Sequence, residues 1–512
     1  PSPAVLEEFE AQNWKIDVYH QAKDDLAKII ADYDGVVIDE ENIIASSILD
    51  KAQRLKVIGI LNKDSVNLDM VKATALGITI VNISKSIASS SAEYTIGQML
   101  YLSRLRRRKN SRELAGKNLG IIGFNQVSTA LAKKARAMDM QVMVYDPTLS
   151  SAKIKAHKIE SNSLIDLLIK ADFLSINISP RDTAFSPLKA EQLSLCKENC
   201  VLINNSAPEM LSQEAIESFI KASKQHFCAF DCPKSYLDYY KDFNLNNQAI
   251  ITENKSADTV ETVRRSAREL SGEMRSVILT GMSENAINIP TIASDKMPLY
   301  APFLKMAAAL GYFMGQYLPG DLKEAVLYDY EQNLTDDAPI LQHLLQYLFT
   351  AMGYENINYV NALSQASKLK LEVYSNTDEK GKGLGLKVRL KNQKEHYLNL
   401  ILSEDKIKIN NLDKHQLNFE LKEHMLLIYH ADKPGVVGLV GSMLGACSIN
   451  ILDMNLDNSL LSEKKALMLI TLDSKVDEDF IKVLSKYDNI YEVYYINIPP
   501  KIYRDFTYEG EN

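Results

Sequence analysis

Along its first half the chain alternates short apolar runs with longer segments that are apolar on one side. This pattern is typical of strands and helices that follow one another in a parallel sheet. Residues 117–147 show it most clearly: an apolar run at 118–123 ends in glycine, a helical pattern follows from about Ser128, and a second run at 142–145 leads to Asp146. This order predicts the βαβ unit that holds a dinucleotide pyrophosphate at a helix N-terminus.

The turn of this unit departs from the phosphate-binding fingerprint, which has glycine at three positions. Here those positions hold Gly123, Asn125 and Ser128. The middle glycine lets the backbone approach the pyrophosphate with no Cβ in the way, whereas Asn125 keeps only a tolerance for positive φ. Ser128 is expected to cap the helix, and Asp146 to accept the ribose hydroxyls of NAD. The pattern therefore indicates the βαβ unit more strongly than it indicates NAD binding.

The same alternation continues on both sides of this unit and predicts an α/β protein. Residues 1–95 are expected to form a small parallel domain, and the segments up to about residue 268 complete a doubly wound parallel sheet. Helices are expected at 4–12, 24–33, 43–51, 68–76, 92–105, 164–171, 188–196, 213–221 and 258–279, and strands at 15–19, 35–38, 57–61, 79–82, 173–178, 200–205, 228–231 and 249–252.

The C-terminal part divides into two further α/β units and a tail. Residues 289–422 are expected to hold helices at 300–317, 343–352 and 361–368 and strands at 323–330, 385–391, 397–403 and 406–409. Residues 423–498 follow the β, α, β, β, α, β order of a ferredoxin-like unit, at 425–430, 435–446, 449–456, 465–473, 477–486 and 490–496. Residues 499–512 are a polar tail. Residues 269–288 are assigned to the first domain, and residues 96–268 form the second.

Composition narrows the class of partner. The 512 residues carry a formal net charge of −8, which argues against nucleic acid or an acidic membrane surface. No apolar run is long enough to span a bilayer and no signal peptide opens the chain, so a cytoplasmic location is expected. Five cysteines indicate a reduced environment. The pairs Cys196/Cys200 and Cys228/Cys232 have a spacing that favours buried thiols over a metal site, and no metal is expected.

The order of elements and four stretches, GKNLGIIGF, VMVYDP, VLINNSAPEMLSQEAI and AFDCP, resemble the D-2-hydroxyacid dehydrogenase family. Two later stretches, INIPTIASDKMPLYAPFLKMAAALG and YVNALSQASKLKLEV, are similar to the intervening domain of the long D-3-phosphoglycerate dehydrogenases. HADKPGVVGLVGSMLGACSINILDMNL is similar to the ACT domain that follows it. The resemblance covers nearly the whole chain. It implies a Rossmann-like sheet with a flavodoxin-like substrate domain, an intervening α/β domain and a C-terminal ACT domain.

The resemblance also shows where the chain departs from the family's catalytic residues. Ala207 stands where the family has the arginine that clamps the substrate carboxylate, and Asn254 where it has the general acid/base histidine. Asparagine has no titratable proton to exchange with the substrate hydroxyl. Tyr236 aligns near the glutamate that orients this histidine. The alternative is sequence drift or an alignment shifted by a residue, and this alternative is strongest for Tyr236. No arginine occurs between Arg181 and Arg264, so a shift of one or two residues cannot supply the clamp at Ala207.

The substrate side departs in the same way. Asp39 and Glu40 replace an Arg-Ser pair that the family uses near the substrate phosphate, and residues 61–65 replace a glycine-rich loop. Two acidic side chains at such a place repel a phosphate. The basic run at 106–109 is interpreted as a solvated helix end, with a phosphate or nucleic-acid patch as the alternative.

The ACT segment keeps the residues that the resemblance assigns to a small amino acid, often serine, at the interface of paired ACT domains. These residues are His430, Asp432 and Asn450. Asp432 suits the ammonium of such a ligand. The following Pro434 and Gly435 are explained by the turn alone, and Asn450 has the alternative of satisfying local backbone groups.

Three hypotheses follow for the function. The first is a pseudoenzyme of the D-3-phosphoglycerate dehydrogenase type, acting as a regulatory or structural oligomer that binds an amino acid. The second is an NAD-dependent dehydrogenase of serine biosynthesis, or an enzyme with altered chemistry in the same cleft. The third is a purely structural or storage protein. A homo-oligomer, dimer or tetramer, is expected, with an active paralogue as a further candidate partner.

Overall fold

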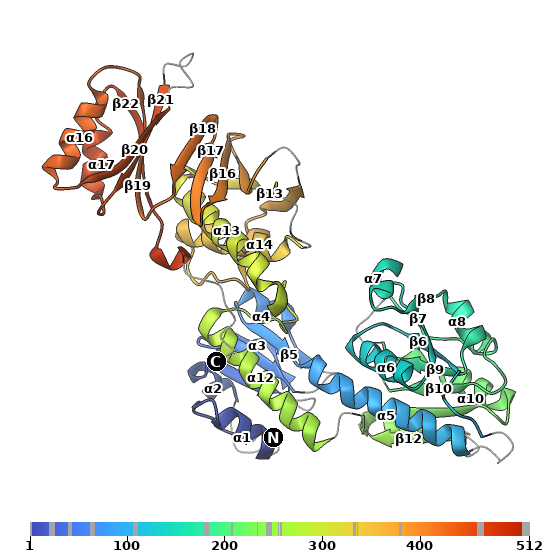
Figure 1. Cartoon of the computed structure of the whole chain (residues 1–512). Coiled ribbons are helices and arrows are strands. Elements are labelled where there is room, and N and C mark those ends of the chain that lie inside the picture. Colours follow the sequence, from blue (N-terminus) through green and yellow to red (C-terminus); the bar gives the residue numbers. More distant parts are fainter. Residues whose placement is uncertain are drawn as a thin grey trace.

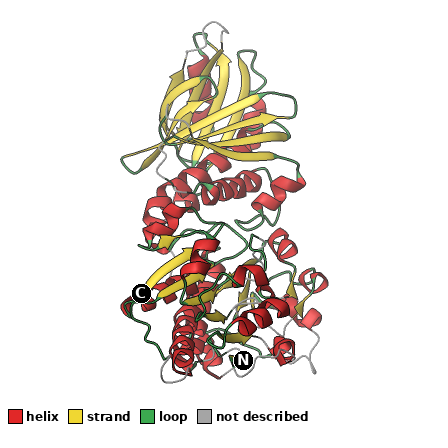
Figure 2. Ribbon diagram, turned by 90° about the vertical axis from the view of Figure 1, so that its right-hand side faces the viewer, coloured by secondary structure: helices red, strands yellow, loops and turns green. Residues whose placement is uncertain are grey.

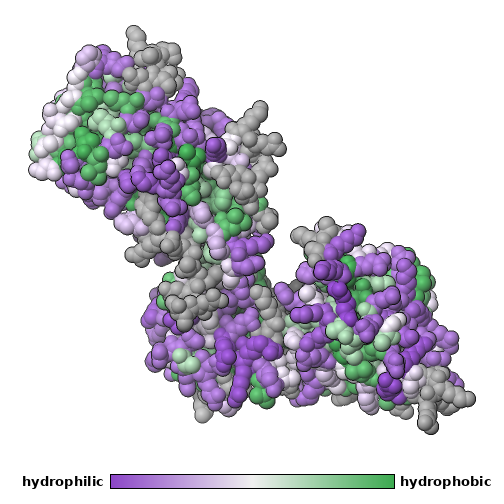
Figure 3. Space-filling model, in the orientation of Figure 1, coloured by the Kyte–Doolittle hydropathy of each residue, from purple (hydrophilic) through white to green (hydrophobic). Residues whose placement is uncertain are grey.

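The computed structural model describes residues 3–19, 26–38, 43–61, 67–105, 111–178, 184–205, 208–232, 234–241, 248–253, 255–256, 259–330, 334, 336–377, 381–457 and 465–503. Within these ranges the strands form sheets of three, seven, six, four and two strands. Figure 1 shows the sheets as successive units along an elongated molecule, and Figure 3 shows a mainly hydrophilic visible face with smaller apolar areas. The predicted α/β class is confirmed.

The first unit is a three-stranded parallel sheet in the order β1-β3-β5. Its strands are β1 (Gly35–Ile38), β3 (Val57–Ile60) and β5 (Thr79–Asn82), flanked by α1 (Pro3–Glu10), α2 (Leu26–Ile29), η1 (Ile30–Asp32), α3 (Ser46–Leu49) and α4 (Met70–Ala75).

Two predictions for this first unit are wrong. Residues 14–19 form no strand, because Trp14 and Ile16 pack against the apolar faces of α1 and a later helix instead of pairing with the sheet. The predicted helix at 43–51 begins only at Ser46, since β2 (Ile43–Ile44) pairs in parallel with β4 (Asn67–Leu68).

The second unit is a seven-stranded parallel sheet in the order β12-β11-β10-β9-β6-β7-β8. The order reverses between β6 and β9, and in open α/β sheets ligands bind at the carboxyl ends of the strands beside such a reversal. The strands are β6 (Asn118–Ile122), β7 (Gln141–Tyr145), β8 (Glu160–Ser161), β9 (Phe173–Ile176), β10 (Val201–Asn204), β11 (Phe227–Cys232) and β12 (Ala249–Glu253). The helices are α6 (Gln126–Ala137), α7 (Ser151–Ala156), α8 (Leu164–Lys170), α9 (Ala190–Leu193), η3 (Pro208–Met210), α10 (Gln213–Ala222) and α11 (Lys234–Lys241).

Two long helices join the first two units. Helix α5 (Ser84–Leu105) leaves the small sheet after β5 and packs along α6, and Figure 1 shows it reaching from one unit to the other. It begins earlier than the predicted residue 92. Helix α12 (Val260–Thr280) returns to the small sheet, where it packs on α1, β3 and β5. Gly281, with φ of 79°, ends α12 in the left-handed conformation that glycine adopts without strain.

The third unit is a six-stranded sheet in the order β14-β13-β15-β16-β17-β18. Its helices are η4 (Ser294–Lys296), α13 (Met297–Tyr317), α14 (Ala338–Ala351) and α15 (Ala362–Lys368). Gly311 and Gly315 of α13 have no room for a Cβ against the backbone of α14, so these two helices pack at very close range. The strands are β13 (Leu322–Asp329), β14 (Glu372–Thr377), β15 (Leu384–Leu390), β16 (Glu395–Ser403), β17 (Lys406–Leu412) and β18 (His415–Glu420), of which β14 and β18 were not predicted.

The fourth unit is an antiparallel sheet in the order β20-β21-β19-β22, with two helices on it. The predicted order of a ferredoxin-like unit is confirmed. Figure 2 shows the strands of the third and fourth units together at one end of the molecule. In the described residues no helix is both long and apolar enough for a membrane span. The elements are β19 (His424–Ala431), α16 (Val436–Ala446), β20 (Ile451–Asp457), β21 (Lys465–Leu472), α17 (Glu478–Leu484) and β22 (Ile490–Asn497), followed by η6 (Pro500–Tyr503).

Candidate functional site

The turn between β6 and α6 requires a glycine at its first position. Gly123 has φ of 86°, in the left-handed region, and a Cβ there would lie 2.5 Å from the carbonyl oxygen of Asn177. Its N–H donates to the Tyr145 carbonyl oxygen over 2.9 Å. The turn is therefore held between the ends of β7 and β9, where a side chain would not fit.

Asn125, and not Ser128, caps α6. Asn125 Oδ1 accepts the Ser128 N–H over 3.1 Å, and its Nδ2 donates to the Asn177 carbonyl oxygen over 2.9 Å. The buried Ser128 hydroxyl donates instead to the Gly123 carbonyl oxygen over 2.6 Å. Asn125 has φ of −112°, so the predicted reliance on positive φ was wrong as well. The helix begins at Gln126 because asparagine is a strong N-cap residue.

The start of α6 offers free hydrogen-bond donors. The N–H groups of Gln126 and Val127 have no acceptor within the described part of the chain. The first N–H groups of a helix lack partners inside it, and the helix dipole favours an anion beside them. This end of α6 therefore fits a phosphate group.

Asp146 follows β7 and anchors the same turn. Its Oδ2 accepts the Phe124 N–H over 2.8 Å, and its Oδ1 accepts the N–H and the hydroxyl of Thr148 over 2.8 and 2.6 Å. An ionised carboxylate has about four acceptor positions. With three of them used, Oδ2 keeps one position for a ribose hydroxyl.

Asp231, at the end of β11, anchors the loop in which the family's histidine is expected. The carboxylate is buried, and its Oδ1 accepts the Thr252 hydroxyl over 2.7 Å and the Lys255 N–H over 2.9 Å. Its Oδ2 accepts the Ser256 N–H over 2.8 Å. Asn254 itself lies outside the described residues. Sequence reasoning missed Asp231, although an acid at the end of an apolar strand was visible.

Helix α5 brings a polar cluster to the same edge of the sheet. The Tyr94 hydroxyl donates to Thr252 Oγ1 over 2.9 Å. Asn205, directly after β10, donates through Nδ2 to Thr95 Oγ1 over 3.0 Å and to Gln98 Oε1 over 2.7 Å. Burial raises the pKa of Tyr94, so the hydroxyl stays a donor. Three polar residues inside the apolar pattern of α5 were the signal that could have revealed this contact.

Tyr236 of α11 is bonded to Glu209 of η3. The Tyr236 hydroxyl donates to Glu209 Oε1, and this hydrogen bond, with burial, raises the pKa of Tyr236 to about 12. The structure thus places a carboxylate beside the residue that aligns near the family's glutamate, and sequence reasoning missed Glu209. Ala207, residues 39–40, the loop at 62–65 and the basic run at 106–109 lie outside the described residues.

His430 is the most distinctive of the predicted residues in the fourth unit. It is 4% exposed, and its Nδ1 lies 2.8 Å from the Ala431 carbonyl oxygen. Because a carbonyl only accepts, Nδ1 donates this hydrogen bond. Nε2 is buried without a partner among the described residues.

The other two predicted residues of this unit are exposed. Asp432 stands in the turn after β19, and Asn450 lies just before β20. The Asn450 N–H donates to Asp473 Oδ1 over 3.0 Å, so its backbone is satisfied locally. A common ligand site for His430, Asp432 and Asn450 stays a prediction.

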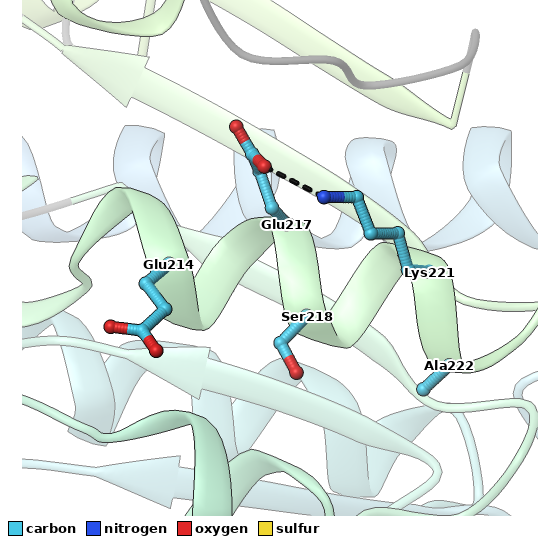
Figure 4. A pocket seen from close by; sticks show the side chains of 5 residues that line it. All are labelled: Glu214, Glu217, Ser218, Lys221 and Ala222. Carbon is cyan, nitrogen blue, oxygen red and sulfur yellow. Dashed lines mark hydrogen bonds and ion pairs between the residues drawn. The ribbon is translucent and has the colours of Figure 1, made fainter.

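An open hollow over α10 does not provide a site. Figure 4 shows that it is lined by side chains from one exposed helix face, Glu214, Glu217, Ser218, Lys221 and Ala222. Lys221 pairs with Glu217 over 2.9 Å, an i,i+4 contact of a solvated helix surface. No group of three or more His, Cys, Asp or Glu in the described ranges could hold a metal ion.

Comparisons with known proteins agree with this architecture. Residues 78–252 match the family model of the D-isomer specific 2-hydroxyacid dehydrogenase, NAD binding domain. The chain is 26% identical over 494 residues to the D-3-phosphoglycerate dehydrogenase of Methanocaldococcus jannaschii, covering 93% of this chain and 94% of the relative. It is 25% identical over 495 residues to that of Synechocystis sp., covering 93% and 89%. It is 22% identical over 488 residues to that of Bacillus subtilis, covering 91% and 92%.

These alignments run through all four units, and the match to the family model falls on β5, α5 and the seven-stranded sheet. The chain is therefore similar over nearly its full length, at about 25% identity, to D-3-phosphoglycerate dehydrogenases, and its residues 78–252 match the NAD binding domain of the D-isomer specific 2-hydroxyacid dehydrogenases.

Proposed function

We propose that the chain is an NAD-dependent oxidoreductase of the D-3-phosphoglycerate dehydrogenase type. The observation that carries the proposal is the β6–α6 turn, in which Gly123 is sterically required and the N–H groups of Gln126 and Val127 have no acceptor among the described residues. These donors suit the pyrophosphate of NAD, and the remaining acceptor position of Asp146 suits a ribose hydroxyl. NAD bound there would accept the hydride from a 2-hydroxy acid such as D-3-phosphoglycerate.

A fluorescence titration with NADH tests the binding step. We expect saturable binding to the wild-type chain and binding weaker by about tenfold or more, that is about 1.4 kcal/mol or more, in Gly123→Ala. The matched control is Gly116→Ala, because Gly116 also has positive φ, 69°, but open space where a Cβ would lie. Absence of binding at millimolar NADH would overturn the proposal.

The turnover expected for this oxidoreductase is low. Ala207 cannot clamp a substrate carboxylate, and Asn254 cannot take the hydroxyl proton. General acid/base catalysis is worth about 10²–10⁴-fold, so turnover is expected well below the usual range of about 1–10³ s⁻¹. A stopped-flow or steady-state assay of NADH formation from D-3-phosphoglycerate and other 2-hydroxy acids measures it. No detectable NADH would favour the non-catalytic alternative.

That alternative is a regulatory protein that binds a small amino acid through its fourth unit. The observation that favours it is His430, whose buried Nε2 has no hydrogen-bond partner among the described residues. An unsatisfied buried polar atom costs about 1–3 kcal/mol, which a hydrogen bond to a polar group of a ligand would offset. Asp432 and Asn450 lie in the positions where the resemblance implies the rest of that site.

Calorimetry with L-serine, glycine and a panel of amino acids tests this second candidate. We expect heat of binding from at least one amino acid in the wild-type chain and in Asp479→Ala, and none in Asp432→Ala. Asp479 is a fitting control because it is an exposed acid on α17 of the same unit. Absence of binding heat from every amino acid up to millimolar concentration, which corresponds to a binding free energy of about −4 kcal/mol, would argue for an assembly role only.

We further propose that the chain assembles as a homo-oligomer. Within the described residues no further strand pairs with the outer edges of β20 and β22, and Leu452 and Leu456 of β20 are 60% and 46% exposed. Exposed sheet edges and apolar side chains favour pairing with a second copy. Light scattering at micromolar concentration is expected to show at least a dimer, and a monomer contradicts the proposal.

A further inference from the structure

A second hollow lies in the second unit, in the groove between α6 and the segment that follows α7. Its volume is about 510 Å³, and six residues line it: Thr129, Lys133, Arg136, Ala137, His157 and Ile159. Ligand pockets typically enclose about 300–1,000 Å³, so a small molecule would fit. None of the six residues is acidic, whereas the hollow over α10 is lined by two glutamates and by a lysine that pairs with one of them.

The hollow has two walls that come from different elements. The four lining residues of α6 are spaced by four, three and one positions, so they lie on one face of this helix. The opposite wall is the segment between α7 and β8, where the His157 side chain is exposed and Ile159 is buried. Arg136 Nη1 lies 3.5 Å from the His157 carbonyl oxygen, and this long hydrogen bond joins the two walls. The site is therefore a groove between two elements and not the surface of a single helix.

The cations of this groove are not neutralised by acidic side chains in the described part of the chain. Lys133 makes no ion pair or hydrogen bond there, and Arg136 makes only the long contact with His157. The neighbouring Lys134 differs, because its ammonium pairs with Glu93 of α5 over 2.8 Å. The dipole of α6 favours cations in its last turn, which explains Lys134 and Arg136 but not an imidazole on the facing wall. In a chain of net charge −8, the groove is therefore a local concentration of positive charge.

We propose that this hollow, the α6–α7 groove, binds the phosphate group of a small anionic ligand. The Arg136 guanidinium can donate two parallel hydrogen bonds to two phosphate oxygens, and the Lys133 ammonium adds a point charge on the same wall. The His157 imidazole is a further donor from the opposite wall. A phosphate monoester carries about −1.5 to −2 charges near pH 7 and has three strong acceptor oxygens. It therefore matches this set of donors better than a carboxylate does.

The α6–α7 groove is separate from the proposed NAD site. That site lies at the N-terminus of α6, whereas Arg136 stands ten residues after Gln126, about 15 Å along the helix. One contact connects the two places, since the rings of Phe124 and His157 meet edge to face with their centroids 5.2 Å apart. The Phe124 N–H is the group that Asp146 holds. An anion bound by His157 would therefore contact a ring that packs against the cofactor turn.

Calorimetry on the full chain tests the proposal, with inorganic phosphate as the free anion and glycerol 3-phosphate as the monoester. Both are titrated with and without saturating NADH, so that binding at the start of α6 is separated from binding in the groove. We expect a dissociation constant of about 1 mM or less for at least one anion in both conditions. The anion that binds more tightly shows whether the groove takes the free ion or an ester. If NADH itself does not bind, the proposed cofactor site fails, while the variants below still test the groove.

Variants of α6 assign the binding to the groove. Lys133 and Arg136 are exposed, so their replacement is expected to keep the fold. In the double variant Lys133→Ala/Arg136→Ala we expect the affinity for the anion to fall by about tenfold or more, because charge-assisted hydrogen bonds are lost. Lys134→Ala is the matched control, since it removes the same charge from the side of the same helix that faces α5, and it is expected to bind as the wild-type chain does.

Acetylation of lysines, read by mass spectrometry, gives a second measurement. The anion is expected to protect Lys133 from acetylation and to leave Lys134 unchanged. The proposal is overturned if neither anion gives heat of binding well above millimolar concentration, or if the double variant binds as tightly as the wild-type chain. It is also overturned if Lys134→Ala loses as much affinity as the double variant, or if the anion does not protect Lys133.

Discussion

Two carboxylates at one edge of the seven-stranded sheet hold their loops in the same way. Asp146, after β7, accepts two backbone N–H groups and the hydroxyl of Thr148. Asp231, in β11, accepts two backbone N–H groups and the hydroxyl of Thr252. Through Phe124, Asp146 holds the turn that still needs Gly123, whereas the loop that Asp231 holds carries Asn254 where the family resemblance expects histidine. The hydrogen bonds that hold a loop in place can therefore be present whether or not the loop carries the residue needed for catalysis.

The two carboxylates differ in their burial. Asp231 is 5% exposed, whereas Asp146 is half-exposed. When a buried carboxylate is separated from its hydrogen-bonding partners, water cannot replace either side of the lost bonds. The loop of Asp231 is thus expected to be the more firmly held of the two, although it lacks the residue that would do acid/base chemistry.

The largest effect is expected from Asp231→Ala. Hydrogen bonds to charged groups contribute about 1.5–3 kcal/mol each, and three are lost, so the unit is expected to lose about 4.5 kcal/mol of stability or more. Thermal unfolding and hydrogen exchange at Lys255 and Ser256 measure the loss. Asp231→Asn is the control, because it keeps one acceptor oxygen and should lose less. Unchanged amide protection in Asp231→Ala would show that the loop is held by other contacts.

A smaller loss of stability is expected from Gly123→Ala. A residue forced into an unfavourable backbone conformation costs about 1–3 kcal/mol, and here the added Cβ also approaches the Asn177 carbonyl oxygen. Gly116→Ala shares the positive φ but not the close approach, so the difference between the two midpoints of thermal unfolding isolates the steric part. Equal midpoints would mean that the turn yields to a side chain.

Asp146→Ala is expected to cost about 1 kcal/mol of stability, because water can reach the half-exposed site and replace the carboxylate at Phe124 and Thr148. Binding of NADH is expected to weaken by about tenfold in the same variant. Fluorescence titration and thermal unfolding on one preparation give both values. If Asp146→Ala destabilises the chain as much as Asp231→Ala, the contrast in burial is not what separates the two loops.

The smallest effect is expected at alkaline pH. The neutral Tyr236 hydroxyl donates to Glu209, and its pKa is raised from the ordinary value of about 10 to about 12. The stabilising contribution of this bond is therefore full below about pH 10 and is lost as the pH rises through about 12. The absorbance difference between the wild-type chain and Tyr236→Phe follows the ionisation. A midpoint near pH 10 would contradict a bond to the carboxylate.

The sequence allowed the β6–α6 unit to be predicted because its signals are local: an apolar run, a turn residue and a helical period within some thirty residues. The cap of α6 was missed although asparagine favours that place. The part played by Asp231 could not be predicted, because its partners lie more than twenty residues further along the chain. The wrong strand at 15–19 has the same origin, since a strand exists only where a partner is present.

Helix α5 follows β5 after a single residue, Ile83, and is held at the carboxyl edge of the seven-stranded sheet by Tyr94, Thr95 and Gln98. A helix of 22 residues is roughly 33 Å long. It is therefore a lever: a tilt of about 5° displaces its far end by about 3 Å at that length. A shift at Asn205 that tilts α5 would accordingly be larger at the first turn of the helix, beside the small sheet, than at the contact itself.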